Sequence, residues 1–314
     1  MTNTFELRGV TKRFGQKIAL DAVSLSVPQH SIVGLVGRNG SGKTTLLRHV
    51  TGLYLSTSGE CITLGCPTAR LGANELSQIG MVNQHATFIE WMKTGQFLRY
   101  IETFYPVWDR ELESQLIASL EIDVNARLGT LSPGNAQKVG LVAATCHHPA
   151  LLLLDEPLSD LDPIVRTRAV TMLLEQFSDD RLTMVISSHM LHDIERIVDR
   201  VVCLDAGRIV ADASLDQLKE SYAEWIVTSP EGSLPQTFSE EYVISQESDG
   251  AESRLEVRAI ANARDEFERM HNVRVEVNAL NLEKIFPLLV GASQPAGSAN
   301  PALTKPVSAA IVSK

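Results

Sequence analysis

The chain has 314 residues, of which 44% are hydrophobic, enough for one large domain and a smaller one with its own core. No apolar run reaches the roughly 18–20 residues of a membrane helix, and the first residues lack the apolar segment of a secretion signal. The net charge of −10 disfavours a nucleic-acid partner, and the four cysteines have no metal-binding or redox spacing, as expected for reduced thiols in the cytoplasm.

Short apolar segments alternate with helical patterns up to about residue 212. The apolar segments show no alternation of polar and apolar positions, which is typical of parallel strands buried on both faces. They lie at 31–37, 151–155, 182–188 and 200–204. We therefore predict an α/β domain with a mostly parallel sheet over residues 1–212, with a helical subdomain inserted at about residues 86–148.

After about residue 213 the pattern changes. Four segments alternate like half-exposed strands, and ARDEFERMH and LEKIFPLLV have helical spacing. We predict a small α+β accessory domain over residues 213–290. Residues 291–314 are rich in Ala, Ser, Pro and Gly and contain no aromatic residue, so we predict a disordered tail.

The segment GRNGSGKT follows an apolar strand and opens a helical pattern, which is the context of a phosphate-binding P-loop. Its glycines let backbone N–H groups surround phosphate oxygens, and the helix N-terminus favours an anion. We expect Lys43 to reach the β- and γ-phosphates of a nucleotide and the Thr44 hydroxyl to hold Mg²⁺. The predicted nucleotide-binding residues here are Gly37, Arg38, Asn39, Gly40, Ser41, Gly42, Lys43, Thr44 and Thr45.

The segment LLLLDEP places two carboxylates where a buried strand ends, at the edge of the sheet where α/β folds bind ligands. We expect Asp155 to hold Mg²⁺ and Glu156 to act as the general base toward the attacking water. An acidic turn after a core strand has the same pattern. Together with the upstream P-loop, the segment indicates a P-loop NTPase that uses ATP and Mg²⁺.

The segment LSPGNAQK (131–138) precedes this strand and places a serine and a glycine at a helix start, which makes a second anion-binding end. Because the chain already has one phosphate loop, the second is expected to serve the ATP of another protomer through Ser132 and Gly134. With the two motifs above, it resembles the signature segment of ABC-type ATPases.

The resemblance to an ABC ATP-binding subunit covers about residues 4–215, and four further landmarks follow the family's order. It implies that Phe14 stacks on adenine, that Gln84 contacts Mg²⁺, that SDLD (159–162) is the D-loop, and that His189 contacts the γ-phosphate. Taken singly, Phe14, Gln84 and His189 are also typical of a core aromatic, a surface amide and a histidine at a strand end.

Three positions depart from the family pattern. Pro133 stands where a glycine is usual and removes one backbone donor, although it suits the first position of a helix. Asp160 adds a carboxylate to the D-loop where a small residue is usual, and this carboxylate either repels nucleotide or points to solvent. Asn135 keeps an amide where the family has glutamine. The sequence therefore predicts a weakened but usable signature.

The resemblance implies an ATP-hydrolysing transporter subunit that dimerises on ATP, either with itself or with a related cassette, and drives a membrane permease from the cytoplasmic face. FYPVWD, SSHMLHDIERIVDRVVCL and LNLEKIF are similar to segments of bacterial export-type ATPases. Local helix packing explains these segments equally well. The alternatives are a soluble ABC ATPase acting on ribosomes or chromosomes, and a regulatory module that binds ATP but hydrolyses it poorly.

The segment after Gln84 is rich in aromatic residues and is predicted to dock the permease. Phe97, Tyr100 and Phe104 have helical spacing and are expected in the core of the subdomain. Phe88 and Trp91 are the expected exposed anchors, because aromatic residues are enriched at interface hot spots.

Overall fold

The computed structural model describes residues 2–84, 88–177, 182–230, 234–235, 237–249, 252–259 and 263–291. Its central sheet has six strands in the order β10-β9-β3-β8-β7-β6. These are β3 (Ile32–Val36), β6 (Ile79–Val82), β7 (Leu151–Asp155), β8 (Thr183–Ser188), β9 (Arg200–Asp205) and β10 (Arg208–Ser214). The strands from β6 to β9 pair in parallel, and β10 pairs antiparallel with β9. The predicted α/β fold with a mostly parallel sheet is confirmed.

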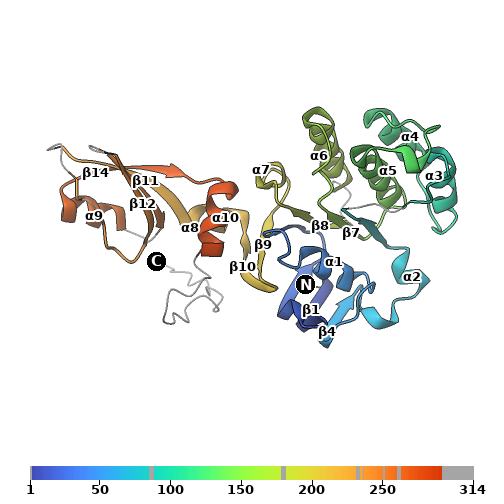
Figure 1. Cartoon of the computed structure of the whole chain (residues 1–314), viewed down its shortest axis with the longest axis horizontal. Coiled ribbons are helices and arrows are strands. Elements are labelled where there is room, and N and C mark those ends of the chain that lie inside the picture. Colours follow the sequence, from blue (N-terminus) through green and yellow to red (C-terminus); the bar gives the residue numbers. More distant parts are fainter. Residues whose placement is uncertain are drawn as a thin grey trace, which may run out of the picture.

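Both faces of this sheet are covered, which explains why its strands are continuously apolar. Within β7, Leu151 and Leu153 belong to one core cluster, and Leu152 and Leu154 belong to the other. The first cluster also contains α1 (Lys43–Val50) and a four-stranded antiparallel sheet in the order β2-β1-β4-β5. That sheet consists of β1 (Asn3–Phe14), β2 (Lys17–Pro28), β4 (Ser58–Thr63) and β5 (Cys66–Pro67). The P-loop helix is therefore packed against both sheets (Figure 1).

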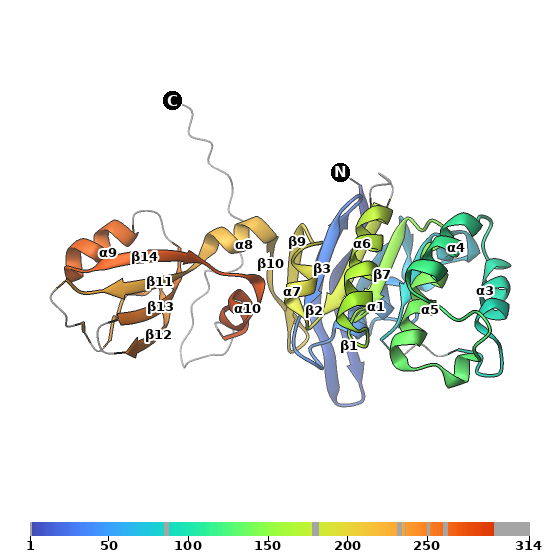
Figure 2. The same cartoon turned by 90° about the horizontal axis from the view of Figure 1, so that it is seen from above.

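Helices cover the other face and form one end of the molecule (Figure 2). Between β6 and β7 lie α3 (Thr94–Glu102), α4 (Arg110–Ser119), the short η2 (Leu128–Thr130) and α5 (Pro133–Thr145). After β7 come α6 (Pro163–Phe177) and α7 (Leu191–Ile194), while η1 (Thr68–Arg70) and α2 (Ala73–Leu76) precede β6. The helical content between β6 and β7 corresponds to the expected insertion, and its bounds as a subdomain stay a prediction.

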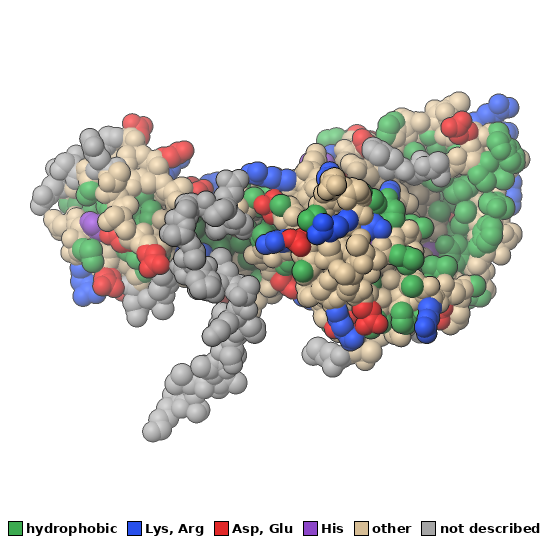
Figure 3. Space-filling view, turned by 60° about the horizontal axis from the view of Figure 1, so that its bottom comes forward, with side chains coloured by type: hydrophobic (Ala, Val, Ile, Leu, Met, Phe, Trp, Pro, Cys, Tyr) green, Lys and Arg blue, Asp and Glu red, His purple; other side chains and the backbone are tan. Residues whose placement is uncertain are grey.

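The aromatic side chains of this region are not distributed as expected. Phe97 is buried, but Tyr100 is 42% exposed and Phe104 is 61% exposed, so their assignment to the core was wrong. Tyr100 lies within α3 but off its buried face, which is formed by Thr94, Phe97 and Leu98. It packs edge-on against Phe104, which follows the helix, with ring centroids 5.1 Å apart. Phe88, expected as an exposed anchor, instead packs on Phe97 at 5.0 Å. Figure 3 shows hydrophobic side chains gathered at this end of the molecule.

The C-terminal part forms a second, smaller unit at the opposite end (Figures 1 and 2). Its sheet has the order β12-β13-β11-β14, and its core is centred on Trp225, Leu255 and Phe267. The elements are α8 (Leu215–Ser221), β11 (Tyr222–Thr228), β12 (Val243–Asp249), β13 (Glu252–Arg258), α9 (Ala263–His271), β14 (Arg274–Ala279) and α10 (Leu282–Gly291). The predicted tail, apart from its first residue, lies outside the described residues.

The last helix, α10, packs on the large domain and not on the small core. Its buried Leu282 and Ile285 share a cluster with Ile194 of α7. Glu195, just after α7, accepts a hydrogen bond from the Leu282 backbone N–H at 3.2 Å and pairs with Lys219 of α8 at 2.7 Å. The segment LNLEKIF therefore connects the C-terminal unit to α7. The predicted boundary near residue 212 stays a prediction.

The cysteines are all free thiols. Burial raises the pKa of Cys61 to about 11 and that of both Cys146 and Cys203 to about 12. Among the described residues, no helix is long and apolar enough to cross a membrane.

Candidate active site

The P-loop connects β3 to α1 at the carboxyl end of the parallel strands, where α/β folds bind ligands. Gly42 has a φ of 114°, in the region that favours glycine, and a Cβ there would lie 2.6 Å from the Ala19 carbonyl oxygen. A side chain at this position would therefore force the loop away from β2. This close approach explains why position 42 is a glycine.

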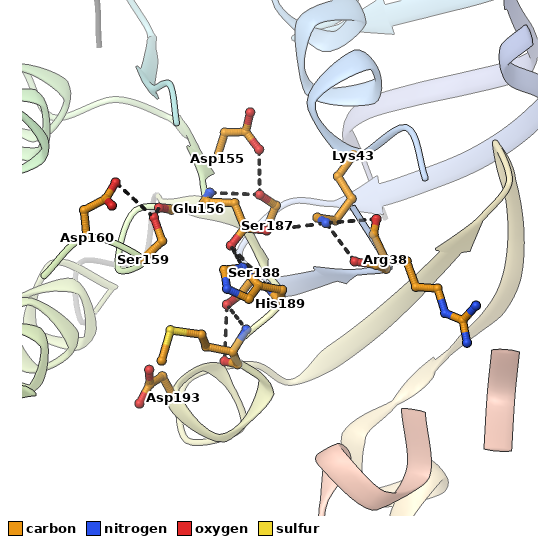
Figure 4. Close-up of polar contacts among 12 residues, drawn as sticks. Arg38, Lys43, Asp155, Glu156, Ser159, Asp160, Ser187, Ser188, His189 and Asp193 are labelled. Atoms are coloured by element: carbon orange, nitrogen blue, oxygen red, sulfur yellow. Dashed lines mark hydrogen bonds and ion pairs between the residues drawn. The ribbon is translucent and has the colours of Figure 1, made fainter. Parts of the chain in front are cut away.

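Lys43 is buried at the first turn of α1, and its ammonium group is held inside the loop. Its Nζ donates a hydrogen bond to the Gly37 carbonyl oxygen at 2.7 Å and lies 3.4 Å from Glu156 Oε1 (Figure 4). A buried ammonium group needs such partners, because an unpaired charge in the interior is strongly disfavoured. The P-loop lysine and the strand-end carboxylate, predicted separately, thus meet in one site.

Ser187, near the end of β8, organises the two acidic residues at the end of β7. Its Oγ donates to Asp155 Oδ1 at 2.7 Å and accepts from the Glu156 N–H at 3.0 Å. His189 then approaches from the same strand end, with Nδ1 2.7 Å from Glu156 Oε2. Asp155, Glu156 and His189, which were predicted separately as metal ligand, general base and γ-phosphate contact, are connected through Ser187 and direct contacts (Figure 4).

The backbone at Glu156 is in an unusual conformation for a residue with a side chain, with φ at 51°. Its N–H donates to both the carbonyl and the hydroxyl oxygen of Ser187, at 3.2 and 3.0 Å. Such conformations persist only where surrounding contacts determine them, and they cluster at active sites. The strain is consistent with a turn built to aim the carboxylate.

A cavity of about 300 Å³ opens over this loop. Its lining contains many of the predicted site residues, together with Lys17 and Ala19, which the sequence reading missed. The predicted residues in the lining are Phe14, Asn39, Gly40, Gly42, Lys43, Thr44, Thr45, Gln84 and Glu156. Phe14 packs edge-on against Tyr54, with ring centroids 5.3 Å apart. The lining of the cavity thus includes both an aromatic ring and the ammonium group of Lys43.

The donor set fits a magnesium ion. Asp155 is buried, and within the described part of the chain nothing donates a hydrogen bond to its Oδ2. The Thr44 hydroxyl and the Gln84 amide, two further oxygen donors, line the neighbouring cavity. Carboxylate and other oxygen ligands are those that Mg²⁺ prefers. The assignment of Asp155, Thr44 and Gln84 as metal ligands stays a prediction that this geometry allows.

Seven predicted site residues are not among those that line the cavity, namely Gly37, Arg38, Ser41, Ser132, Gly134, Asp155 and His189. Arg38 points its guanidinium away from Lys43, and only its backbone carbonyl lies near the ammonium (Figure 4). Ser132 and Gly134 lie at the start of α5, whose first helical residue is Pro133. Ser132 is the N-cap, and its Oγ accepts a hydrogen bond from the Asn135 N–H at 3.3 Å. Neither Ser132 nor Gly134 lines the P-loop cavity.

The sequence reading also missed Ser187 and Gln137. Ser187 pairs in register with Asp155 between neighbouring parallel strands. Its position one residue before the end of β8 was the available signal, because strand ends in a parallel sheet meet at one edge. Gln137 gave no local signal beyond its place in LSPGNAQK.

The chain is similar to known proteins of one family. The family model described as ABC transporter matches residues 20–159. The ABC transporter ATP-binding protein YtrB of Bacillus subtilis (strain 168) is 31% identical over 217 residues, covering 69% of this chain and 74% of that protein. The phosphonates import ATP-binding protein PhnC of Frankia casuarinae is 33% identical over 232 residues, covering 68% of this chain and 92% of that protein. The dimeric ATP-binding cassette MJ0796, solved with ADP and Pi, matches with a TM-score of 0.61 at 24% identity, covering 67% of this chain and 98% of its own.

Proposed function

The chain belongs to the ATP-binding subunits of ABC transporters, which are ATPases, and we propose that two copies bind ATP head to tail to drive a separately encoded membrane permease. The observation that carries the proposal is the separation of two anion-binding elements within one chain. Lys43 lines the P-loop cavity, whereas Ser132 caps a different helix and does not line it. A nucleotide in the cavity would therefore meet the Ser132 of another chain.

Within this composite site each residue has a distinct role. Lys43 binds the phosphates, and Glu156 accepts a proton from the attacking water. His189, 2.7 Å from Glu156 Oε2, orients that carboxylate and contacts the γ-phosphate. Magnesium, held by Asp155, Thr44 and Gln84, supplies charge neutralisation at the phosphates when bound.

Replacing Pro133 with glycine tests the altered signature. Pro133→Gly restores a backbone N–H at the first turn of α5. A hydrogen bond from this N–H to a charged phosphate contributes about 1.5–3 kcal/mol, whereas the greater conformational freedom of the glycine backbone costs about 0.5–1 kcal/mol. We expect a tighter ATP-bound dimer and modestly faster turnover, measured as turnover against protein concentration. The matched control is Pro163→Gly at the start of α6, which adds flexibility to a helix start outside the signature. A weaker dimer for Pro133→Gly alone would mean that the proline preorganises the helix.

The aromatic end of the helical region is the proposed docking surface for the permease. Trp91 is 72% exposed, and Tyr100, Phe104 and Val107 lie exposed in the same region. Large exposed apolar groups gathered together are typical of interaction sites (Figure 3). Residues 85–87, between Gln84 and this surface, lie outside the described residues.

Trp91→Ala tests the docking surface. Because the side chain is exposed and lies outside the cavity, we expect unchanged basal ATPase activity and loss of the stimulation that the permease gives. Truncation of an interface hot spot costs about 2 kcal/mol or more. Met270→Ala, an equally exposed apolar residue on α9, is the control. Equal stimulation of both variants would exclude Trp91 from the interface.

We propose export as the direction of transport and the cytoplasmic face of the membrane as the location. Support for export is limited to FYPVWD, SSHMLHDIERIVDRVVCL and LNLEKIF, and a relative of similar identity is named an import protein. Transport of substrate into or out of vesicles containing the permease decides the direction.

A further inference from the structure

Gln137, in the second turn of α5, is almost fully buried and is hydrogen-bonded to the turn that follows β7. Its Nε2 lies 3.1 Å from the Glu156 carbonyl oxygen, 3.2 Å from Ser159 Oγ and 3.3 Å from Asp160 Oδ2. Its Oε1 accepts from the Asp160 N–H at 3.3 Å. An amide NH₂ has two hydrogens, so it shares them among these three acceptors. One side chain thus contacts three residues of the turn, Glu156, Ser159 and Asp160.

The turn requires such contacts because of its backbone. Glu156 has a φ of 51°, which a residue with a side chain adopts only where its surroundings impose it. Ser187 binds the N–H of Glu156, and Gln137 binds its carbonyl oxygen. The two contacts hold the Glu156 residue from both sides and come from different elements, β8 and α5.

The same turn lies directly on the start of α5. A Cβ at Gly134 would be 2.4 Å from the Asp160 carbonyl oxygen, so glycine is needed for this approach. The Asp160 carboxylate, which replaces the small residue usual in the resembled family, folds back onto Gln137. The extra carboxylate is therefore engaged within its own chain.

We propose that Gln137, anchored by Asp160, is a positioning residue that couples the two nucleotide half-sites of one chain. Through Gln137, the helix capped by Ser132 fixes the orientation of Glu156. A shift of Ser132 on binding the γ-phosphate of one ATP thereby adjusts the base that acts on the other. This inference rests on the proposed roles of Ser132 and Glu156.

The test is a double-mutant cycle of Gln137→Met and Asp160→Ala, with kcat and KM for ATP measured for each variant and for the pair. Methionine keeps the length of the buried side chain and removes its hydrogen bonds. Gln137 does not line the cavity, so we expect the KM for ATP to stay within about twofold of normal. We expect kcat to fall about tenfold, because the lost hydrogen bonds no longer hold Glu156 in position. Asp160→Ala should lower kcat by about threefold, and the double variant should resemble Gln137→Met alone, because both act through one contact.

Unchanged kcat in Gln137→Met with a lower melting temperature would overturn the proposal, since it would show a packing role only. Faster turnover or a lower KM in Asp160→Ala would also overturn it, because the carboxylate would then be repelling nucleotide. Asp160 is exposed, so this arm remains decisive if Gln137→Met does not fold. Turnover of Glu156→Gln is measured in parallel. Retained turnover in this variant refutes the role of Glu156 as the general base. Lost turnover in Glu156→Gln together with normal turnover in Gln137→Met refutes only the coupling.

Discussion

Glu156→Gln lowers ATP turnover by about 10²–10⁴-fold, the usual contribution of a positioned general base. The change replaces one carboxylate oxygen by an amide of nearly the same shape, in a turn whose backbone is held by Ser187 and Gln137. ATP affinity should therefore change little. Steady-state phosphate release and equilibrium ATP binding are measured on the same preparation.

The matched control for this variant is Glu113→Gln, a carboxylate of α4 that accepts a hydrogen bond from Trp108 outside the cavity. It should hydrolyse ATP at the normal rate. A general base is expected to contribute at least about 10²-fold to turnover. If Glu156→Gln retained more than about a tenth of normal turnover, another group would have to accept the proton.

Lys43→Ala raises the dissociation constant for ATP by about 10²-fold, because hydrogen bonds to charged groups contribute about 1.5–3 kcal/mol each and 1.4 kcal/mol corresponds to a factor of ten. The buried Nζ, 2.7 Å from the Gly37 carbonyl oxygen, is placed inside the P-loop for such contacts. Titration with a non-hydrolysable ATP analogue measures the effect.

The Lys43 variant also leaves Glu156 without its 3.4 Å ammonium partner, and removing one member of a buried pair is destabilising. A thermal melt must therefore accompany the titration. Lys93→Ala, an exposed lysine next to α3, is the control and should bind ATP normally. Normal affinity in a folded Lys43→Ala protein would remove the P-loop from the binding site.

The parts of the fold that could be predicted are those with a local signal. The strands β3, β7, β8 and β9 are short and continuously apolar because helices and a second sheet cover both faces. The second sheet itself was not anticipated. In β1 the pairing register shifts between Leu7 and Val10, and this irregularity breaks the alternation that would mark a half-buried strand.

The candidate site divides in the same way. The P-loop and the strand-end carboxylates could be predicted because each is formed by residues that are contiguous in the sequence. Ser187 and Gln137 could not, because their roles depend on strand register and on the packing of α5 against the turn. Tyr100 shows a further limit: helical spacing predicted it in the core, but it lies off the buried face of α3 and packs against Phe104 at the surface.

The central claim is that each nucleotide is bound between the P-loop of one chain and Ser132 of another. Sizing chromatography with light scattering of Glu156→Gln, with and without Ser132→Arg, tests it in saturating ATP and Mg²⁺. We expect a dimer that requires ATP for Glu156→Gln, and a monomer with unchanged ATP affinity when the exposed Ser132 is also replaced by arginine. A Glu156→Gln protein that stays monomeric with ATP bound, or an ATP-dependent dimer that persists with Ser132→Arg, would contradict the composite site.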